Sequence, residues 1–458
     1  MSSSIPTEAD NRLASDRVDT IRLNVNEAEE HKDGMTTPQD PLTRRIRDKE
    51  AEMAALQQEL HQLYQDAGQE QAPPLAGLKI VDLSWAVFGP LSTQILSDMG
   101  AEVIKVERLT GDLARGSQSF IAINRNKHSI AINLQTPEGR EIVLQLAATA
   151  DILVQNFRPG VIERLGLDYE QVRQRNPQII YCSLSGYGDS GPYRTRGGQD
   201  HIIQGMSGMM SIIGTDDGEP MSAGFYVCDV TGAHYNAIAM LLGLVARQRR
   251  GIGQKIDLAL LDTAIATQAF PVTWALNYPH DQPRKAGHGH WTRRPLYGVY
   301  PTRDLPLTLV AFGDDRWDRL STMPDLESLA DDPRFATGES RLQHGEALNA
   351  KIAELLKAQP RDTWLQRFAE AKILSGPVYT YADLFADPQF QHNQMVSELT
   401  DPDGKPVKLV SNPIRMAETP GKLRTTPPTL GQHTDMVLQH LGYADDDIHR
   451  LREKQVVL

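Results

Sequence analysis

The stretch LKIVDLSWAVFGPLSTQILSDMGAEVIKVE, residues 78–107, decides the fold. It opens and closes with apolar runs of strand character, and Gly89-Pro90 introduces a helix between them. A strand, a helix and a second strand in this order form a βαβ unit, which implies a parallel sheet with a right-handed crossover. The turn after the first strand has no Gly-x-Gly-x-x-Gly motif, so the sequence predicts a Rossmann-like sheet without an NAD site.

The alternation of strands and helices continues beyond this unit. Further strands are expected at residues 129–133, 151–155, 179–184 and 255–260. Ligands of parallel sheets bind at the carboxyl ends of the strands, where the loops of this chain carry many basic and amide side chains. Each alone is typical of a solvated surface, but together they suggest one pocket for a phosphorylated ligand. These residues are Arg108, Arg115, Asn124, Arg125, Asn126, Lys127, Asn156, Arg158 and Arg164.

The composition is that of a globular protein, with 40% hydrophobic and 23% charged residues among 458. The formal net charge of −12 argues against bulk binding of nucleic acid, which needs a basic face. Cys182 and Cys228 are the only cysteines, which indicates a reducing compartment and no disulfide framework. No apolar run approaches the ~20 residues of a membrane span, and the N-terminus lacks the features of a secretory signal. The sequence therefore predicts a cytoplasmic protein with no membrane or nucleic-acid partner.

Two segments of different character precede the sheet. Residues 1–41 are polar and acidic, which predicts a disordered tail. Residues 42–73 are predicted to form an amphipathic helix and a linker. Such a helix packs either on its own body or in a coiled coil with a partner, and the sequence leaves both open. Its apolar residues at 3/4/7 spacing are Ile46, Met53, Leu56, Leu60 and Leu63.

Asp229 stands between a short apolar run, residues 225–228, and a helical run from Thr231 through Arg247. The pattern is that of a strand, an acid and a helix start. One interpretation is an N-cap, whose side-chain oxygen satisfies a free N–H group of the first turn. The other is a carboxylate nucleophile that the N–H groups and dipole of the helix keep ionised. The pattern alone favours the N-cap.

A metal site is the alternative role for His288 and His290. Two histidines two positions apart, with no acidic or thiol third ligand close by, do not define such a site. We therefore predict that the protein has no metal centre.

An ordered series of motifs resembles the class III CoA-transferases, which include formyl-CoA:oxalate transferase, carnitine CoA-transferase and the α-methylacyl-CoA racemases. The resemblance runs from about Pro74 to the C-terminus and leaves the N-terminal extension outside. Besides the Asp229 stretch, the matching motifs are PLAGLKIVDL (74–83), GP (89–90), GAEVIKVE (100–107), NRNK (124–127), NFRPG (156–160), YCSLSGYG (181–188), GQKID (253–257), GPV (376–378) and GQHT (431–434).

The resemblance implies an α/β fold in an interlocked homodimer. Each chain of such a dimer has a large Rossmann-like domain, built from both ends of the chain, and a smaller α+β domain from its middle. In this sequence the large CoA-binding domain would begin with residues 74–275. Residues 285–395 would form the small domain, and residues 400–458 would return to the large domain.

The resemblance also implies a CoA-transferase reaction of the EC 2.8.3 type, with Asp229 as the nucleophile. Its carboxylate would attack an acyl-CoA thioester and form a mixed anhydride, then an aspartyl-CoA thioester, before an acceptor acid takes the CoA. Gly287 and Gly289 would belong to a mobile loop whose N–H groups approach the reacting carbonyl. The substrates would be an acyl-CoA and a small carboxylic acid, without a permanent cofactor. CoA would contact Trp85, Ala86, Val87, Phe88, Arg108, Ile132, Asn156, Phe157 and Arg164.

The branch of the family is indicated by fewer residues. Residues 124–127 and 288–297 look most like the branch that uses succinyl-CoA, which is therefore the expected donor. Val87 stands where formyl-CoA enzymes have a glutamine, so formyl and oxalate specificity is not expected.

Two alternative functions remain at this point. One is an α-methylacyl-CoA racemase or epimerase, which uses a histidine directly before an aspartate. This chain has Gln199 there, before Asp200, and glutamine is no general base; His201 would project from another face. The other alternative is a non-catalytic CoA-binding subunit whose N-terminal helix recruits a partner.

Overall fold

The computed structural model describes residues 41–66 and 72–458, apart from 216, 286, 288 and 293. The chain forms two compact units, residues 1–71 and 72–458. In the first unit the structure describes helix α2 (Pro41–Asp66), which covers most of the expected amphipathic segment. The apolar side chains of Ile46, Leu56 and Leu63 are exposed on it. The expected tail, up to residue 40, lies outside the described residues.

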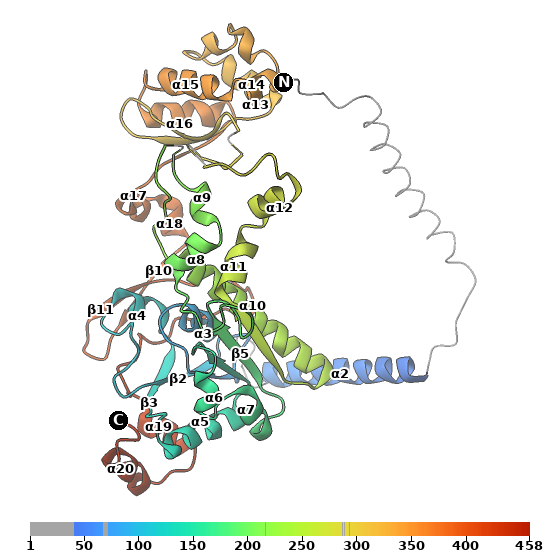
Figure 1. Ribbon diagram of the computed structural model, residues 1–458, viewed down its shortest axis with the longest axis vertical. Coiled ribbons are helices and arrows are strands. Elements are labelled where there is room, and N and C mark those ends of the chain that lie inside the picture. Colours follow the sequence, from blue (N-terminus) through green and yellow to red (C-terminus); the bar gives the residue numbers. More distant parts are fainter. Residues whose placement is uncertain (1–40, 67–71, 216, 286, 288, 293) are drawn as a thin grey trace. The chain divides into compact units, whose positions relative to one another are not determined.

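A six-stranded parallel sheet organises the second unit (Figure 1). Its strand order, β3-β2-β1-β4-β5-β6, confirms the expected Rossmann-like sheet. The expected βαβ unit at residues 78–107 is β1, α3 (Phe88–Asp98) and β2. The strands are β1 (Lys79–Asp82), β2 (Glu102–Glu107), β3 (Lys127–Ala131), β4 (Ile152–Gln155), β5 (Ile180–Ser185) and β6 (Gln254–Ala259).

Helices cover both faces of this sheet because its central strands are apolar on both sides. In β1, Ile80 and Val81 point to opposite faces and join two different hydrophobic cores. One core is completed by α5 (Pro137–Thr149), α7 (Tyr169–Arg175), α19 (Thr434–His440) and α20 (Asp445–Glu453). The other is completed by α3, α8 (Asp200–Met206), α10 (Val227–Arg250) and α11 (Leu260–Thr267).

The chain enters α10 without the strand expected at residues 225–228. Helix α10 already begins at Val227, after a bend that contains Gly224 at φ +78°. Phe225 and Tyr226 are largely exposed, so this apolar run does not mark a buried strand. Short helices of the second unit are α4 (Gln118–Ile123), α6 (Val161–Arg164), α9 (Met209–Ile212), which contacts α8, and α12 (Ala269–Asn277), which contacts α11.

A second hydrophobic layer lies in the middle of the chain. Antiparallel strands β7 (Tyr297–Tyr300), β8 (Leu307–Val310) and β9 (Leu374–Pro377) form a small sheet. Trp364 and Phe368 are fully buried beneath it. Its helices are α13 (Asp314–Ser321), α14 (Gly338–Gln343), α15 (Gly345–Leu356) and α16 (Arg361–Glu370). Helices α17 (Tyr381–Ala386) and α18 (Pro388–His392) follow, and then a hairpin of β10 (Val396–Thr400) and β11 (Pro406–Val410).

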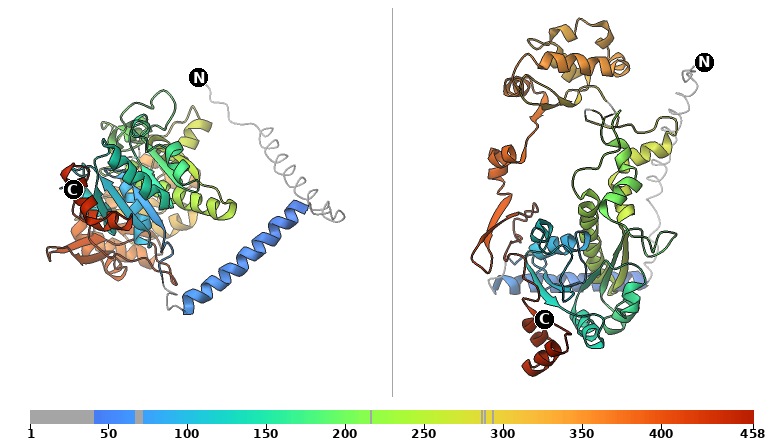
Figure 2. Two further views of the ribbon diagram at one scale, coloured as in Figure 1. Left: turned by 90° about the horizontal axis from the view of Figure 1, so that it is seen from below. Right: turned by 60° about the vertical axis from the view of Figure 1, so that its left-hand side comes forward.

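The C-terminal segment packs against the edge of the large sheet at β3 (Figure 2). The N–H of His433 donates to the Ser129 carbonyl at 2.9 Å, and the N–H of Gly431 donates to Ser129 Oγ at 3.0 Å. Farther along, Val457 forms an antiparallel bridge with Ile132. The two ends of this unit therefore build one domain. No helix among the described residues is long and apolar enough to cross a membrane.

Candidate active site

Asp229 lies in the first turn of α10, two residues after the helix begins at Val227. This position is inside the helix, so the N-cap interpretation of Asp229 is wrong. The residue at the N-cap, Tyr226, makes no capping hydrogen bond with its side chain. The Asp229 side chain therefore has no capping duty, and within the described part of the chain no hydrogen bond to its carboxylate is found.

Asp200 performs the capping of α10 from a different helix. Its Oδ1 atom accepts the N–H of Cys228 at 2.8 Å and the N–H of Asp229 at 3.1 Å. Asp200 is itself the first residue of α8, after Gln199. Asp200 is buried, so this carboxylate serves the neighbouring helix rather than solvent.

A glutamine on the next turn of α8 extends this contact to the loop before α10. Gln204 Nε2 donates to Asp200 Oδ2 at 2.5 Å and to the Phe225 carbonyl at 3.2 Å. Its Oε1 atom accepts the N–H of Ala223 at 2.9 Å. We call Asp200 and Gln204 the α8 clamp, because together they hold the loop and the first turn that carry Asp229.

The pKa of Asp229 is raised from the ordinary aspartate value to about 7, first by burial and second by the negative charge of Asp200. The sequence interpretation expected the N–H groups of the helix to keep this carboxylate ionised. Those groups are bonded to Asp200 instead, so burial decides the shift. A carboxylate that titrates near neutral pH, at a helix start, is typical of a functional site.

The expected CoA residues at 85–88 form the turn between β1 and α3. Trp85 and Asn156 bond reciprocally: the Trp85 N–H donates to Asn156 Oδ1 at 3.0 Å, and Asn156 Nδ2 donates to the Trp85 carbonyl at 2.8 Å. Ala86 has φ +65°, a left-handed conformation that is uncommon for a residue with a Cβ atom, and its N–H donates to Asp112 Oδ1 at 3.1 Å. These bonds hold the turn in its shape.

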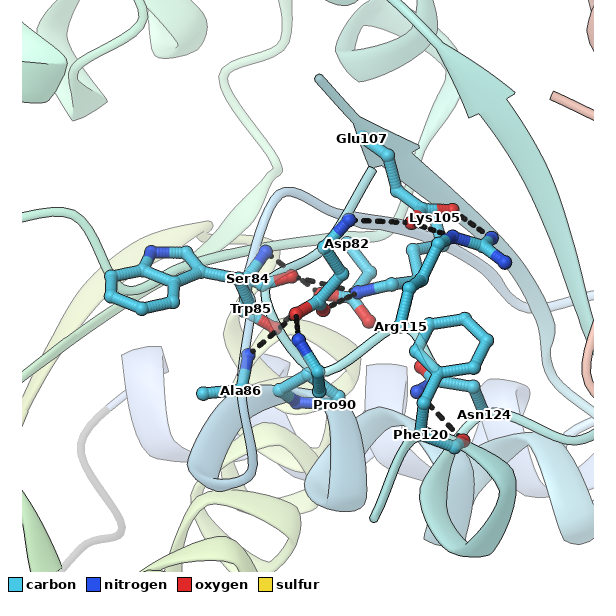
Figure 3. Close-up of polar contacts among 12 residues, drawn as sticks. Asp82, Ser84, Trp85, Ala86, Pro90, Lys105, Glu107, Arg115, Phe120 and Asn124 are labelled. Atoms are coloured by element: carbon cyan, nitrogen blue, oxygen red, sulfur yellow. Dashed lines mark hydrogen bonds and ion pairs between the residues drawn. The ribbon is translucent and has the colours of Figure 1, made fainter. Parts of the chain in front are cut away.

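Buried ion pairs support this turn from beneath (Figure 3). Lys127 Nζ lies 3.1 Å from Asp82 Oδ2, and Lys105 Nζ lies 2.8 Å from Asp112 Oδ2. Burial alone would raise the pKa of Asp82, but the two ammonium groups and the hydroxyls of Ser84 and Thr93 hold it at about 2. Burial lowers the pKa of Lys127 to about 8, against the attraction of Asp82. Both partners of that pair are therefore ionised at pH 7.

These pairs correct the expectation that the basic and amide residues form one phosphate pocket. Lys127 and Arg125 are buried, and Arg125 forms an ion pair with Asp98 at 2.6 Å. Arg115 forms a two-point pair with Glu107, at 2.6 and 2.7 Å. Because their charges are neutralised by ion pairs within the protein, these residues stabilise the site rather than bind phosphate. Arg108, in contrast, is exposed.

A cavity of about 220 Å³ opens beside the turn and brings together three of the expected CoA residues. Trp85, Arg108 and Phe157 line it, with Lys105 and Asp112 at its wall. A larger cavity of about 970 Å³ lies between hairpin β10–β11 and helix α18 and contains none of the expected site residues. The smaller cavity is the better candidate for part of a CoA site.

The remaining expected CoA residues lie at different places. Val87 is half-buried at the start of α3, and Arg164 ends α6 beside Gly160. Ile132 is fully buried in the core, and its N–H donates to the Glu107 carbonyl at 2.7 Å. Its side chain and its backbone N–H are therefore both turned away from the cavity.

Phe88 connects the turn to the helix of Asp229. Its ring lies 2.9 Å from where a Cβ atom on Gly232 would stand, so α3 and α10 approach closely only because this residue is glycine. Gly232 follows Asp229 by one helical turn. The structure thus brings the expected CoA turn and the expected nucleophile to one face of α10.

No hydrogen bond or ion pair among the described residues joins the glycine loop to Asp229. Gly287 has φ +58°, and its N–H donates to the Gly214 carbonyl at 3.0 Å. Gly289 packs on β7, where a Cβ atom would come within 2.5 Å of Gly298 Cα. His288 lies outside the described residues, and no group of three or more potential metal ligands occurs among those the structure describes.

Sequence reasoning missed the α8 clamp and the ion pair of Asp82 with Lys127. The spacing of Asp200 and Gln204, four residues apart, places both on one face of a helix, but nothing in that pattern names the distant helix they bond. Gln199 lies at the N-cap of α8, directly before Asp200, and both Gln199 and His201 are exposed. The described part of α8 therefore does not contain the histidine–aspartate pair of a racemase.

The chain is similar to known proteins over most of its length. Residues 75–434 match the model of CoA-transferase family III. The succinate–glutarate CoA-transferase of Agrobacterium fabrum is 38% identical, over 81% of this chain and 96% of its own. The human succinyl-CoA:glutarate CoA-transferase is 33% identical, over 84% and 90%. The crystal structure of a CaiB/BaiF family protein from Brucella suis superposes with a TM-score of 0.74, at 37% identity over 81% of this chain and 100% of that one. The chain belongs to CoA-transferase family III.

Proposed function

We propose that this enzyme transfers coenzyme A from succinyl-CoA to a second dicarboxylic acid of similar size, and that Asp229 carries the acyl group and then CoA. The position of Asp229 supports this most: it stands in the first turn of α10, free of capping duty, with a pKa of about 7. The names of the two similar transferases support succinyl-CoA as donor and glutarate as the acceptor to test first.

In the proposed reaction the Asp229 carboxylate attacks the thioester carbonyl of succinyl-CoA. The C–S bond breaks, which gives a succinyl–aspartyl anhydride and the CoA thiolate. The thiolate then attacks the aspartyl carbonyl and expels succinate, leaving an aspartyl-CoA thioester. The acceptor carboxylate repeats both steps in reverse. Each attack forms a tetrahedral oxyanion that needs N–H donors, a role for which we propose the loop of Gly287 and Gly289.

Part of the CoA moiety would lie in the cavity lined by Trp85, Arg108 and Phe157. Arg108 is an exposed cation at its rim and would attract the phosphates of the cofactor. Phe88 lies between this region and the helix of Asp229, so the thioester end would be directed toward the nucleophile.

The test is to incubate the enzyme with succinyl-CoA, add hydroxylamine and map the adduct by mass spectrometry. A hydroxamate on Asp229 is the expected result, followed by CoA transfer when glutarate is supplied. An adduct on another residue, or none with any acyl-CoA, contradicts the assignment of Asp229. Deuterium uptake at the α-carbon of an acyl-CoA without any acceptor acid would instead indicate a racemase.

The pH dependence of turnover follows from the raised pKa of Asp229. The nucleophile must be ionised, so kcat/KM is expected to rise with pH and to level off above about 7. The measurement is the steady-state rate between about pH 5.5 and 8.5, at constant ionic strength. A profile that is already flat at the acidic end contradicts a nucleophile that titrates near neutrality.

We further propose that the enzyme is an interlocked homodimer. Helix α10 exposes four apolar side chains on one face, Ile238, Leu241, Leu242 and Val245, and α12 exposes Phe270. Soluble monomers rarely expose contiguous apolar patches of this kind, and a second copy of the chain would cover them.

Light scattering is expected to give the mass of two chains for the native protein. Leu242→Glu is expected to weaken the association, because it places a charge on that face. Leu342 is equally exposed but lies elsewhere, on α14, so Leu342→Glu is the matched control and keeps the native mass. A native protein with the mass of one chain overturns the proposal.

A further inference from the structure

The α8 clamp holds Asp229 through its backbone, not through its side chain. Asp200 Oδ1 accepts two N–H groups of the first turn of α10, and Gln204 bonds the loop at residues 223–225. Asp200 and Gln204 are 6% and 1% exposed, so neither side chain serves solvent. No ion pair of Asp200 is found among the residues that the structure describes, and a buried carboxylate without a cation is costly to keep, which calls for a reason beyond capping.

We propose that Asp200 is a positioning residue that fixes the first turn of α10 and, by its negative charge, favours the acylated forms of Asp229 over the free carboxylate. This inference rests on the proposed function, because it assigns a role in the same covalent cycle. It concerns a residue that never touches the substrate.

The physical argument follows the charge through the cycle. In the free enzyme, Asp200 Oδ1 accepts the backbone N–H of Asp229 at 3.1 Å, and its negative charge repels the Asp229 carboxylate. When Asp229 becomes an anhydride or a thioester it is neutral, and its charge leaves on the CoA thiolate or on succinate. Acylation therefore relieves the repulsion. Hydrogen bonds from the first-turn N–H groups to the Asp229 carboxylate would instead stabilise its ionised form. Asp200 accepts two of these N–H groups, so they do not bond the Asp229 carboxylate.

The other groups that the structure describes around the first turn of α10 do not supply this charge. Cys228 is a neutral thiol at pH 7, because burial raises its pKa to about 12. One turn farther, α3 and α11 present Phe88 and Leu260, which are apolar. After burial, the negative charge of Asp200 is the second cause of the raised pKa of Asp229.

The test compares Asp200→Asn with the native enzyme. Asparagine keeps an oxygen that accepts the two N–H groups and removes the charge, although its Nδ2 atom no longer accepts the bond from Gln204. At fixed succinyl-CoA and succinate concentrations, the ratio of trapped to free Asp229 is expected to fall at least about tenfold, equivalent to about 1.4 kcal/mol. The apparent pKa of kcat/KM is expected to fall below that of the native enzyme. Asp262→Asn is the matched control, since Asp262 is an exposed first-turn aspartate of α11, and both readouts should remain native.

A second variant separates position from charge. Gln204→Ala removes the bonds to the loop but keeps Asp200, so turnover should fall while the apparent pKa stays near the native one. This variant also decides the case if Asp200→Asn does not fold: native turnover in Gln204→Ala would overturn the positioning role. Equal trapping and equal pH profiles in native enzyme and Asp200→Asn overturn the proposal while the nucleophile stands. No trapping in the native enzyme overturns the proposed function, and this inference with it.

Discussion

Replacement of Asp229 by alanine is expected to reduce CoA transfer by a factor on the order of 10⁴ or more, because it removes the covalent step itself. The cavity proposed to bind CoA is lined by Trp85, Arg108 and Phe157, so binding of CoA should remain close to native. The measurements are the exchange rate with succinyl-CoA and glutarate, and the dissociation constant of CoA by calorimetry. Retained exchange at near-native rate contradicts the covalent mechanism.

Asp229→Asn supplies a control for folding that also tests the buried charge. The raised pKa of Asp229 means that its contribution to stability is present at low pH and is lost as pH rises through about 7. The neutral asparagine avoids this loss, so the inactive variant is expected to be about 1–3 kcal/mol more stable than the native enzyme at pH 8, and nearly equal at pH 4. Thermal unfolding at both pH values measures the difference. A loss of stability at pH 8 would show that the native structure uses the charge.

Replacement of Lys127 by methionine is expected to produce the largest loss of stability. Its ammonium group is fully buried and bonds Asp82 Oδ2, the Pro90 carbonyl at 2.7 Å and Asn124 Oδ1 at 2.9 Å. Methionine fills similar space but leaves the Asp82 carboxylate buried without this partner. Breaking a buried pair in this way costs about 3–5 kcal/mol. Denaturant unfolding at pH 7 measures the loss.

Two controls distinguish this charge effect from simple loss of packing. Lys408 lies beside Glu398 on an exposed hairpin, so Lys408→Met is expected to change stability by less than about 0.5 kcal/mol. Adding Asp82→Asn to Lys127→Met removes the unpaired charge and should recover part of the loss. A double variant that is worse than the sum of its single changes contradicts this account of the pair.

The local pattern of the sequence predicted the large sheet well, because each strand carries its own signal. The run at residues 102–107 becomes β2 with those bounds, and the parallel order follows from the alternation with helices. The start of α10 was misplaced because an apolar run before an acid looks alike in a strand and in an exposed loop. Exposure of Phe225 and Tyr226 depends on neighbours that no local window contains.

Pairings between distant residues account for what sequence reasoning missed at the site. Lys127 and Asp82 are 45 positions apart, and Asp200 and Asp229 are 29 apart. A basic residue in a loop carries the same local signal whether it binds phosphate or a buried carboxylate. The fold decides between them: β1 and β3 both pair with β2, and Lys127 at the start of β3 lies 3.1 Å from Asp82 at the end of β1.

The junction between β3 and the C-terminal segment has a consequence for synthesis on the ribosome. Ser129 bonds residues more than 300 positions later in the chain, and Ile132 forms its β-bridge with Val457. This side of the sheet stays open until the C-terminal segment has been synthesised, and an unpaired strand edge is prone to wrong pairing. Nascent chains stalled before this segment should therefore need a chaperone. A deletion within the segment should lower the yield of folded protein before it lowers the catalytic rate.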